Sequence, residues 1–260
     1  MLEKSLVKLI RSLEHKKFRK RHNLFVAEGP KAVGDIMAKN QPYVILATAE
    51  WEPPLQHKGQ YRFIRISEEE LAKISFLQHP QNVIGVFPII NEQDIENISP
   101  DEKLVIVIDG VQDPGNMGTI IRIADWFGIE YIVCSNDTVD AYNPKTVQAT
   151  MGSLAHVNII YTDLESLFDR FSGKAHIYGT VLDGEDIYNT QLESNGFIVM
   201  GNEGKGISQA IRNRIDKKLL IPNFSKSDTA ESLNVAIATA ITCSEFLRRK
   251  TINCLTTINR

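Results

Sequence analysis

Cysteine is scarce in this chain of 260 residues. Cys134, Cys243 and Cys254 are odd in number and far apart, and none belongs to a CxxC pair. That pattern argues against disulfides and a structural zinc site, and it indicates a reducing compartment. No apolar run approaches membrane-spanning length, and the first residues lack the apolar core of a signal peptide. We therefore expect a cytoplasmic protein without a membrane segment.

An excess of positive charge is also absent. The chain has 29 Lys and Arg against 32 Asp and Glu, for a net charge of -3, so no global nucleic-acid signature exists. Apolar residues make up 43% and charged residues 23%, as in ordinary soluble proteins. These fractions argue against a disordered or fibrous chain, and the length suffices for one large domain or two of ordinary size.

The common nucleotide-binding loops are missing too. GNEGKGIS, residues 201–208, has two residues between its first two glycines where a P-loop has four, and Lys205 is followed by glycine. No GxGxxG spacing follows a candidate strand. What remains is a loop whose glycines permit close backbone approach to a ligand, with Glu203 at its tip. The alternative is a sharp strand-to-helix turn with a solvated glutamate.

Alternating strand and helix patterns divide the chain into two predicted α/β domains. The first covers residues 1–90, a polar linker covers 91–103, and the second covers 104–260. Strands of the second domain are expected at 104–109, 131–135, 176–181, 196–201 and 218–222. Helices are expected there at 117–127, 144–151, 164–171, 207–214 and 231–250. Such regular alternation indicates a parallel sheet with helices on both faces.

Residues 1–22 are predicted to form one amphipathic helix with a strongly basic end. Leucine and isoleucine recur at helical spacing from Leu2 to Leu13. Five cations follow: Lys16, Lys17, Arg19, Lys20 and Arg21. Cations near a helix C-terminus suit the helix dipole, and the same cluster could bind phosphates. We predict that these residues contact RNA.

Three stretches of the second domain share one design, a strand followed by a polar or glycine-rich loop. The first is LVIVIDGVQDPGNMGTIIRIADWFGI, which carries Asn116 and Arg122. The second is FIVM followed by GNEGKGIS, and the third is LLIP followed by NFSKSDTAESLNVAIATAI. Ligands of α/β proteins bind where parallel strands end and helices begin. The alternative makes Arg122 a surface residue paired with Asp125.

The third stretch has two readings of its own. Ser232 is a candidate N-cap for a helix rich in small residues, and Asn234 stands beside it. Either both residues simply cap that helix, or they also face a ligand.

Taken in order, these motifs resemble the SpoU (TrmH-like) family of RNA ribose 2′-O-methyltransferases, within the SPOUT superfamily. The matching stretches are DPGNMGTIIRIADWFG, NPKTVQATMGSL, GNEGKGIS, and IP followed by ESLNVAIATAI. HNLFVAEGPKAV and QHPQNVIGVF resemble the family's substrate-binding domain, so the resemblance covers nearly the whole chain. It implies an α/β fold: a C-terminal parallel-sheet domain with a trefoil knot, plus a smaller N-terminal α/β domain. One departure is residues 223–231, longer than the loop usual in the family, which bears on the cofactor pocket.

The resemblance also implies the chemistry. A methyl group would pass from S-adenosylmethionine to a ribose 2′-hydroxyl of structured RNA, ribosomal or transfer, without a metal ion. Cofactor contacts would come from Thr180, Leu182, Gly201, Ile221 and Leu233. The catalytic site would hold Arg122, Asn116, Glu203, Ser232 and Asn234. A homodimer through the catalytic domain is expected as well.

The role of Arg122 follows from its chemistry. Its counterpart in the family is proposed to activate the hydroxyl, but a guanidinium stays protonated and is a very poor base. We therefore predict that Arg122 clamps a phosphate, and the proton acceptor stays open. Two alternatives also stay open: a base methyltransferase of the same fold, and an RNA-binding module that has lost catalysis. The motifs do not identify the RNA or the nucleotide.

Overall fold

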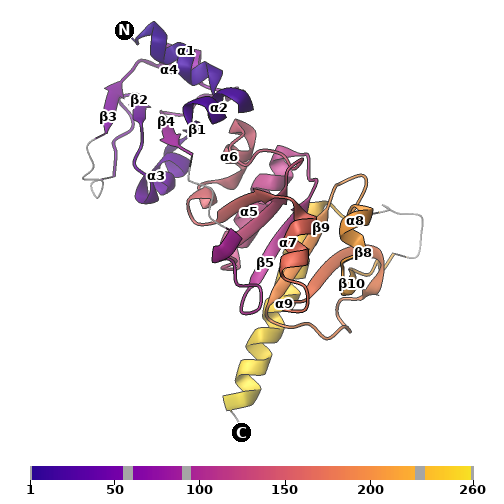
Figure 1. Cartoon of the computed structure of the whole chain (residues 1–260). Coiled ribbons are helices and arrows are strands. Elements are labelled where there is room, and N and C mark those ends of the chain that lie inside the picture. Colours follow the sequence, from indigo (N-terminus) through magenta and orange to yellow (C-terminus); the bar gives the residue numbers. More distant parts are fainter. Residues whose placement is uncertain (1, 55–60, 90–94, 226–231, 259–260) are drawn as a thin grey trace. The chain divides into compact units, whose positions relative to one another are not determined.

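The computed structural model describes residues 2–54, 61–89, 95–225 and 232–258, with side chains to residue 249 (Figure 1). By its contacts the chain forms two compact units. Unit 1 consists of Met1–Asn91 and Asp140–His156, and unit 2 of Glu92–Val139 and Val157–Arg260. The predicted division differs in two segments. Asp140–His156 packs within unit 1 rather than with the second domain, and the predicted linker belongs to unit 2 from Glu92 onward.

Unit 1 is built on a four-stranded sheet of order β1-β4-β2-β3. Its strands are β1 (Leu24–Glu28), β2 (Val44–Ala47), β3 (Arg62–Arg65) and β4 (Val83–Pro88). β4 is antiparallel to both neighbours, whereas β2 and β3 are parallel. Its helices are α1 (Lys4–Ser12), α2 (Lys16–His22), α3 (Pro30–Lys39), α4 (Glu68–Ile74), α6 (Pro144–Thr150) and the 3-10 turn η2 (Ser153–Ala155).

The single helix predicted over residues 1–22 is wrong. The chain turns between α1 and α2, and Arg19 explains why the turn is stable. Its Nη1 donates to the carbonyl oxygens of Leu13 and Glu14, each at 2.7 Å. These carbonyls at the end of α1 are therefore satisfied without a continuing helix.

Segment Asp140–His156 is fastened to unit 1 by packing and by charge. The rings of Phe25 on β1 and Tyr142 lie 4.9 Å apart. Nη2 of Arg19 lies 2.7 Å from Oδ2 of Asp140, and the Arg19 side chain is only 2% exposed. Both contacts join parts of the chain more than 100 residues apart.

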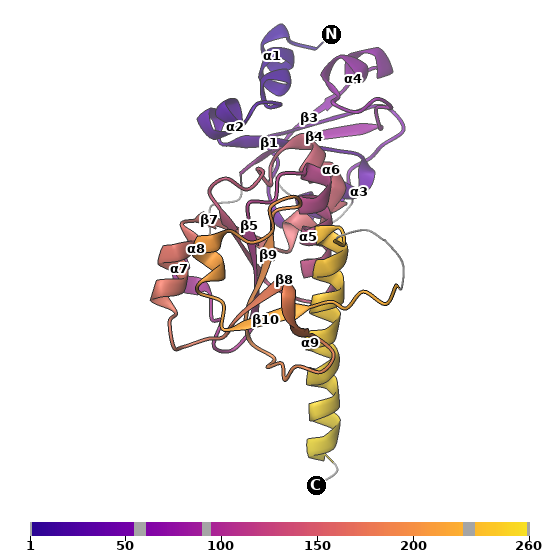
Figure 2. The same ribbon diagram turned by 90° about the vertical axis from the view of Figure 1, so that its right-hand side faces the viewer.

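Unit 2 contains a six-stranded parallel sheet of order β10-β8-β9-β5-β6-β7 (Figure 2). Its strands are β5 (Leu104–Asp109), β6 (Tyr131–Ser135), β7 (Asn158–Thr162), β8 (Ile177–Asp186), β9 (Gly196–Gly201) and β10 (Lys217–Leu220). Its helices are α5 (Pro114–Trp126), α7 (Leu164–Arg170), α8 (Gln209–Arg212), α9 (Val235–Ile258) and the short η1 (Ile95–Asn97). β7 is the one strand of this sheet that the sequence patterns did not predict.

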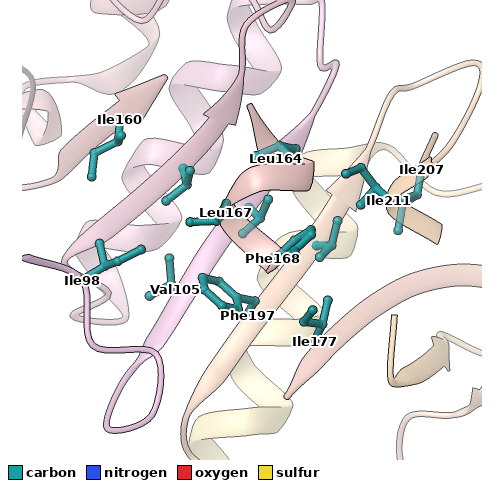
Figure 3. Packing of buried hydrophobic residues seen from close by; sticks show 13 residues of the cluster. Ile98, Val105, Ile160, Leu164, Leu167, Phe168, Ile177, Phe197, Ile207 and Ile211 are labelled. Carbon is teal, nitrogen blue, oxygen red and sulfur yellow. The ribbon is translucent and has the colours of Figure 1, made fainter. Parts of the chain in front are cut away.

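Apolar side chains hold the helices onto the sheet. Leu167 and Phe168 of α7 and Ile211 of α8 pack against Val105 and Phe197 of the strands (Figure 3). α9 packs against α5 and β9. No helix within the described ranges combines the length and apolarity needed to cross a membrane.

Candidate active site

The candidate site begins where β5 and β9 end side by side. Asp109 and Gly201 are paired in register, so the loops that follow them leave the sheet together. Oδ2 of Asp109 accepts a hydrogen bond from the backbone N–H of Ser208 at 2.7 Å, and this side chain is buried. The loops after β5 and β9 are therefore held together at the carboxyl edge of the sheet, where α/β proteins bind ligands.

Asn202 organises the loop after β9. Its backbone exchanges two hydrogen bonds with Gly206, at 3.0 and 2.9 Å. Its Oδ1 accepts from the backbone N–H groups of Gly204 and Lys205, and its Nδ2 donates to the carbonyl of Gly110 at 2.6 Å. Asn202 was not among the predicted site residues, although an asparagine that starts a glycine-rich loop is a known turn former.

Glycine is required at position 201 for a local reason. A Cβ there would lie 2.3 Å from the backbone carbon of Gly206 and 2.3 Å from the nitrogen of Ile207. The close backbone approach expected for this loop therefore occurs, but between parts of the loop itself. Gly206 adopts φ +69°, which other residues reach only at a cost.

Glu203 joins this loop to the loop after β5. Its Oε2 accepts from the backbone N–H of Gln112 at 3.2 Å. Its Oε1 accepts from the backbone N–H of Asp113 at 3.2 Å and from Nδ2 of Asn116 at 3.0 Å. Oδ1 of Asn116 accepts in turn from Nδ2 of Asn234 at 2.8 Å. Glu203, Asn116 and Asn234, hereafter the carboxamide network, connect all three predicted motifs.

The hydrogen bonds fix the ionisation of Glu203. Partial burial acts to raise the pKa of its carboxyl, but the bonds from Asn116, its own backbone N–H, Gln112 and Asp113 together outweigh burial and lower that pKa. The carboxylate is therefore charged at neutral pH and engaged as an acceptor. A group of this kind is a weak base, so we assign Glu203 to holding the loops rather than to taking a proton.

In the third motif, Asn234 caps the helix and Ser232 faces the cavity. Oδ1 of Asn234 accepts from the backbone N–H groups of Ala236 and Ile237, at 2.9 and 3.3 Å. Asn234 is therefore the N-cap of α9, and the predicted cap at Ser232 is wrong because the helix begins three residues later. Ser232 instead lines a cavity.

That cavity has a volume of about 580 Å³, within the range of small-molecule sites. All residues predicted to contact the cofactor line it: Thr180, Leu182, Gly201, Ile221 and Leu233. Glu203, Ser232 and Lys205 line it as well. Residues 226–231, most of the unusually long loop, lie outside the described residues.

One wall of the cavity comes from an irregularity in β8. Its ladder with β10 pairs Gly179 with Lys218 and then Glu185 with Leu219. The intervening residues 180–184 leave the ladder, and four of them line the cavity. Gly184 permits the return to the ladder, because a Cβ there would lie 2.6 Å from the backbone carbon of Leu219.

The lining suits a ligand with apolar and polar parts. Leu182 and Leu233 are 70% and 50% exposed, so a ligand would cover apolar surface on both. Asp183 forms an ion pair with Arg212, and this hydrogen bond is the main cause that lowers the pKa of its carboxyl. An adenosine attached to a charged amino acid combines these features, so the residues present fit S-adenosylmethionine.

Arg122 is the one predicted catalytic residue that neither lines the cavity nor belongs to the carboxamide network. It lies on α5, its side chain is exposed, and it is not among the residues that line the cavity. The structure thus gathers four of the five predicted catalytic residues and leaves Arg122 apart.

Four of the five cations predicted to contact RNA are exposed, and the fifth, Arg19, is buried. Lys16, Lys17, Lys20 and Arg21 are exposed on α2. Arg19 is buried against Asp140, so its predicted contact with RNA is wrong. A helix of seven residues cannot expose every side chain, and the sequence does not reveal which cation faces inward.

Comparison with known proteins agrees with this geometry. The SpoU rRNA Methylase family model matches residues 103–244, and the MRM3-like substrate binding domain model matches residues 4–85. The 23S rRNA (guanosine(2553)-2′-O)-methyltransferase RlmP of Bacillus subtilis is 33% identical in an alignment of 244 residues that covers 90% of this chain and 93% of that protein.

Two solved structures are similar over nearly the whole chain. One is described as an RNA methyltransferase of the TrmH family from Porphyromonas gingivalis, with 36% identity and a TM-score of 0.87, covering 96% of this chain and 99% of that one. The other is an AdoMet-bound rRNA methyltransferase from Sinorhizobium meliloti, with 30% identity and a TM-score of 0.81, covering 96% of both chains.

Fold, cavity and comparisons together define an S-adenosylmethionine-dependent RNA methyltransferase with a substrate-binding domain ahead of its catalytic domain. More narrowly, the chain belongs to the SpoU rRNA Methylase family.

Proposed function

We propose that this protein methylates the ribose 2′-hydroxyl of a guanosine in large-subunit ribosomal RNA. The observation that carries the proposal is the carboxamide network, which locks three motif loops around a cavity suited to S-adenosylmethionine. The similarity to a 23S rRNA guanosine 2′-O-methyltransferase over 90% of the chain supports both the ribose and the ribosomal substrate. A cytoplasmic location accords with this substrate and stays a prediction.

The chain's own residues act mainly by positioning. When bound, S-adenosylmethionine supplies an electrophilic methyl group on a sulfonium. Gly201, Ile221 and Leu233 would hold it from the loops, and Thr180 and Leu182 of β8 line the same cavity. The carboxamide network keeps these loops in register, and a fixed donor and acceptor geometry can contribute several orders of magnitude to a transfer rate.

Among the predicted catalytic residues gathered here, Ser232 is the one left to meet the substrate. It lines the cavity, whereas Asn116 and Asn234 are engaged with each other and Glu203 is engaged with three donors. We infer that Ser232 orients the attacking hydroxyl. The proton acceptor is not assigned to any of these residues.

The location of the methyl group tests the function. Ribosomal RNA from a deletion strain would be methylated by the purified protein, digested with nucleases and analysed by mass spectrometry. A guanosine carrying the methyl on its ribose is the expected product. A methylated base would show that the enzyme belongs to the alternative reaction class, and the absence of both transfer and S-adenosylmethionine binding would favour an RNA-binding module.

Replacing Glu203 with glutamine is expected to lower kcat about tenfold to a hundredfold. The amide of glutamine would turn a donor toward N–H groups that need an acceptor, so the loops after β5 and β9 would separate. Methyl-transfer assays with radioactive S-adenosylmethionine measure the effect. Glu102→Gln, an exposed glutamate before β5, is the matched control and should retain the wild-type rate.

We also infer a homodimer through the catalytic domain and a trefoil knot, both expected from the family. Trp126 on α5 is 85% exposed and Ile237 on α9 is 52% exposed, which supports burial of these helices against a second copy. Arg122 on α5 is exposed and does not line the cavity of its own chain, which supports a site completed by the partner. The exposed cations of α2 would contact RNA phosphates.

Mixing two inactive variants tests the shared site. Arg122→Ala and Gly201→Val chains should each be inactive as homodimers, and a mixed dimer should recover activity because one site has both parts intact. Recovery would require that Arg122 acts in trans. A monomer in analytical ultracentrifugation, or no recovery from dimers shown to exchange chains, would contradict this arrangement.

A further inference from the structure

Helix α2 carries a row of rings beside its cations. His15, Phe18 and His22 follow one another along one side of the helix, and we call them the α2 rings. The centroids of His15 and Phe18 lie 6.4 Å apart, and those of Phe18 and His22 also lie 6.4 Å apart. Phe18 and His22 are nearly parallel, with 22° between their planes.

These rings are accessible. His15 and His22 are exposed, and Phe18 is partly exposed. Arg19 is the buried residue of α2, and its side chain donates a hydrogen bond to Asp140 within unit 1. The α2 rings are therefore not part of the apolar core, and packing does not account for three rings at this spacing.

The segment that carries the rings is basic. Lys16, Lys17, Lys20 and Arg21 stand between or beside the ring residues in the sequence, and no acidic residue occurs between Glu14 and Glu28. Nζ of Lys17 lies 4.9 Å from the centre of the Phe18 ring. Such a surface is complementary to a polyanion, and rings interleaved with cations match the chemistry of unpaired nucleotides, whose bases stack while their phosphates bind the cations.

We propose that the α2 rings and their cations bind an unpaired stretch of the RNA substrate by base stacking. This inference rests on the proposed function, and it adds the kind of RNA structure that unit 1 selects. A duplex keeps its bases stacked on each other, so it can use the cations but not the rings. The α2 surface therefore favours loops, bulges or single strands of the RNA substrate over duplex.

Fluorescence anisotropy with two labelled mixed-sequence oligoribonucleotides tests the proposal on the full chain. One oligonucleotide is unstructured, and the other is a hairpin duplex with the same number of phosphates. Phe18→Leu keeps an apolar side chain but removes the ring, and His22→Ala alters only an exposed residue. Each should weaken binding of the unstructured RNA about tenfold and leave hairpin binding nearly unchanged.

Salt dependence separates stacking from charge. Phe18→Leu should leave the slope of log affinity against log salt unchanged, whereas Lys17→Gln with Lys20→Gln should reduce its magnitude by about 1.4 on the unstructured RNA. Tyr43→Leu, another exposed aromatic of unit 1, and Lys4→Gln with Lys8→Gln on α1 are the matched controls.

Two results would overturn the inference: unchanged binding of the unstructured RNA by His22→Ala and Phe18→Leu, or equal losses for both RNAs. If Phe18→Leu fails to fold, as judged by circular dichroism, His22→Ala decides alone. Methyl transfer to ribosomal RNA is measured in parallel. Transfer by the wild type with no effect of ring variants refutes only the stacking surface, whereas a wild type that neither transfers methyl groups nor binds either RNA refutes the proposed function as well.

Discussion

Replacing Arg122 with alanine is expected to lower kcat for methyl transfer about 10³-fold, while the affinity for S-adenosylmethionine stays nearly unchanged. Arg122 is exposed on α5 and does not line the cavity, so its removal leaves the cofactor pocket intact. A guanidinium that holds a phosphate fixes the nucleotide during the reaction, and loss of such positioning or of one stabilising donor costs orders of magnitude. Steady-state assays give kcat, and calorimetric titration gives the cofactor dissociation constant.

A lysine at position 122 tests whether the guanidinium group itself is needed or only its positive charge. Arg122→Lys should recover only part of the activity, because an ammonium cannot make the paired hydrogen bonds of a guanidinium. Arg170→Ala, which removes an exposed arginine paired with Glu96, is the matched control and should leave kcat unchanged. Equal losses of kcat and cofactor affinity in Arg122→Ala would contradict a clamp on the RNA.

Arg19→Met is expected to reduce the free energy of unfolding of unit 1 by about 3–5 kcal/mol, since it leaves Asp140 largely buried without its partner. The substitution also removes the donors that satisfy the carbonyls of Leu13 and Glu14. Hydrogen exchange measures the loss best, because a chain with two units need not unfold in one step. Amides of β1 and α6 should exchange faster, while those of β5 and β9 in unit 2 should not.

A surface ion pair provides the comparison. Lys31 and Asp35 are 64% and 36% exposed and lie one helical turn apart on α3. Lys31→Met should change stability by no more than about 0.5 kcal/mol. If Arg19→Met has an effect as small as that, the Arg19–Asp140 pair does not hold segment Asp140–His156 in place.

The sheet of unit 2 could be predicted because parallel strands buried on both faces form runs of β-branched residues. β5 is LVIVID and β9 is GFIVMG, and their predicted bounds match those observed. β7 was missed because NIIYT begins and ends with a polar residue, so its apolar run is only three residues long. The fold class was thus within reach of local patterns and the family resemblance.

The site could be predicted only in part. Glycine loops at strand ends identified the region of the cavity, since close backbone approach has a sequence signature. Asn202 was missed because its role depends on Gly110, which lies 92 residues earlier in the chain. Arg19 was misassigned because burial of one cation among five is decided by its partner Asp140, 121 residues away.

The return of segment Asp140–His156 to unit 1 has a consequence for chimeras with relatives. The chain crosses between the units after Asn91, after Val139 and after His156, so no single cut separates them. A fragment beginning at Glu92 would carry Tyr142 and α6 without the Phe25 and β1 that cover them. Exchange of unit 1 between two such enzymes therefore requires the transplantation of two stretches at once, residues 1–91 together with residues 140–156.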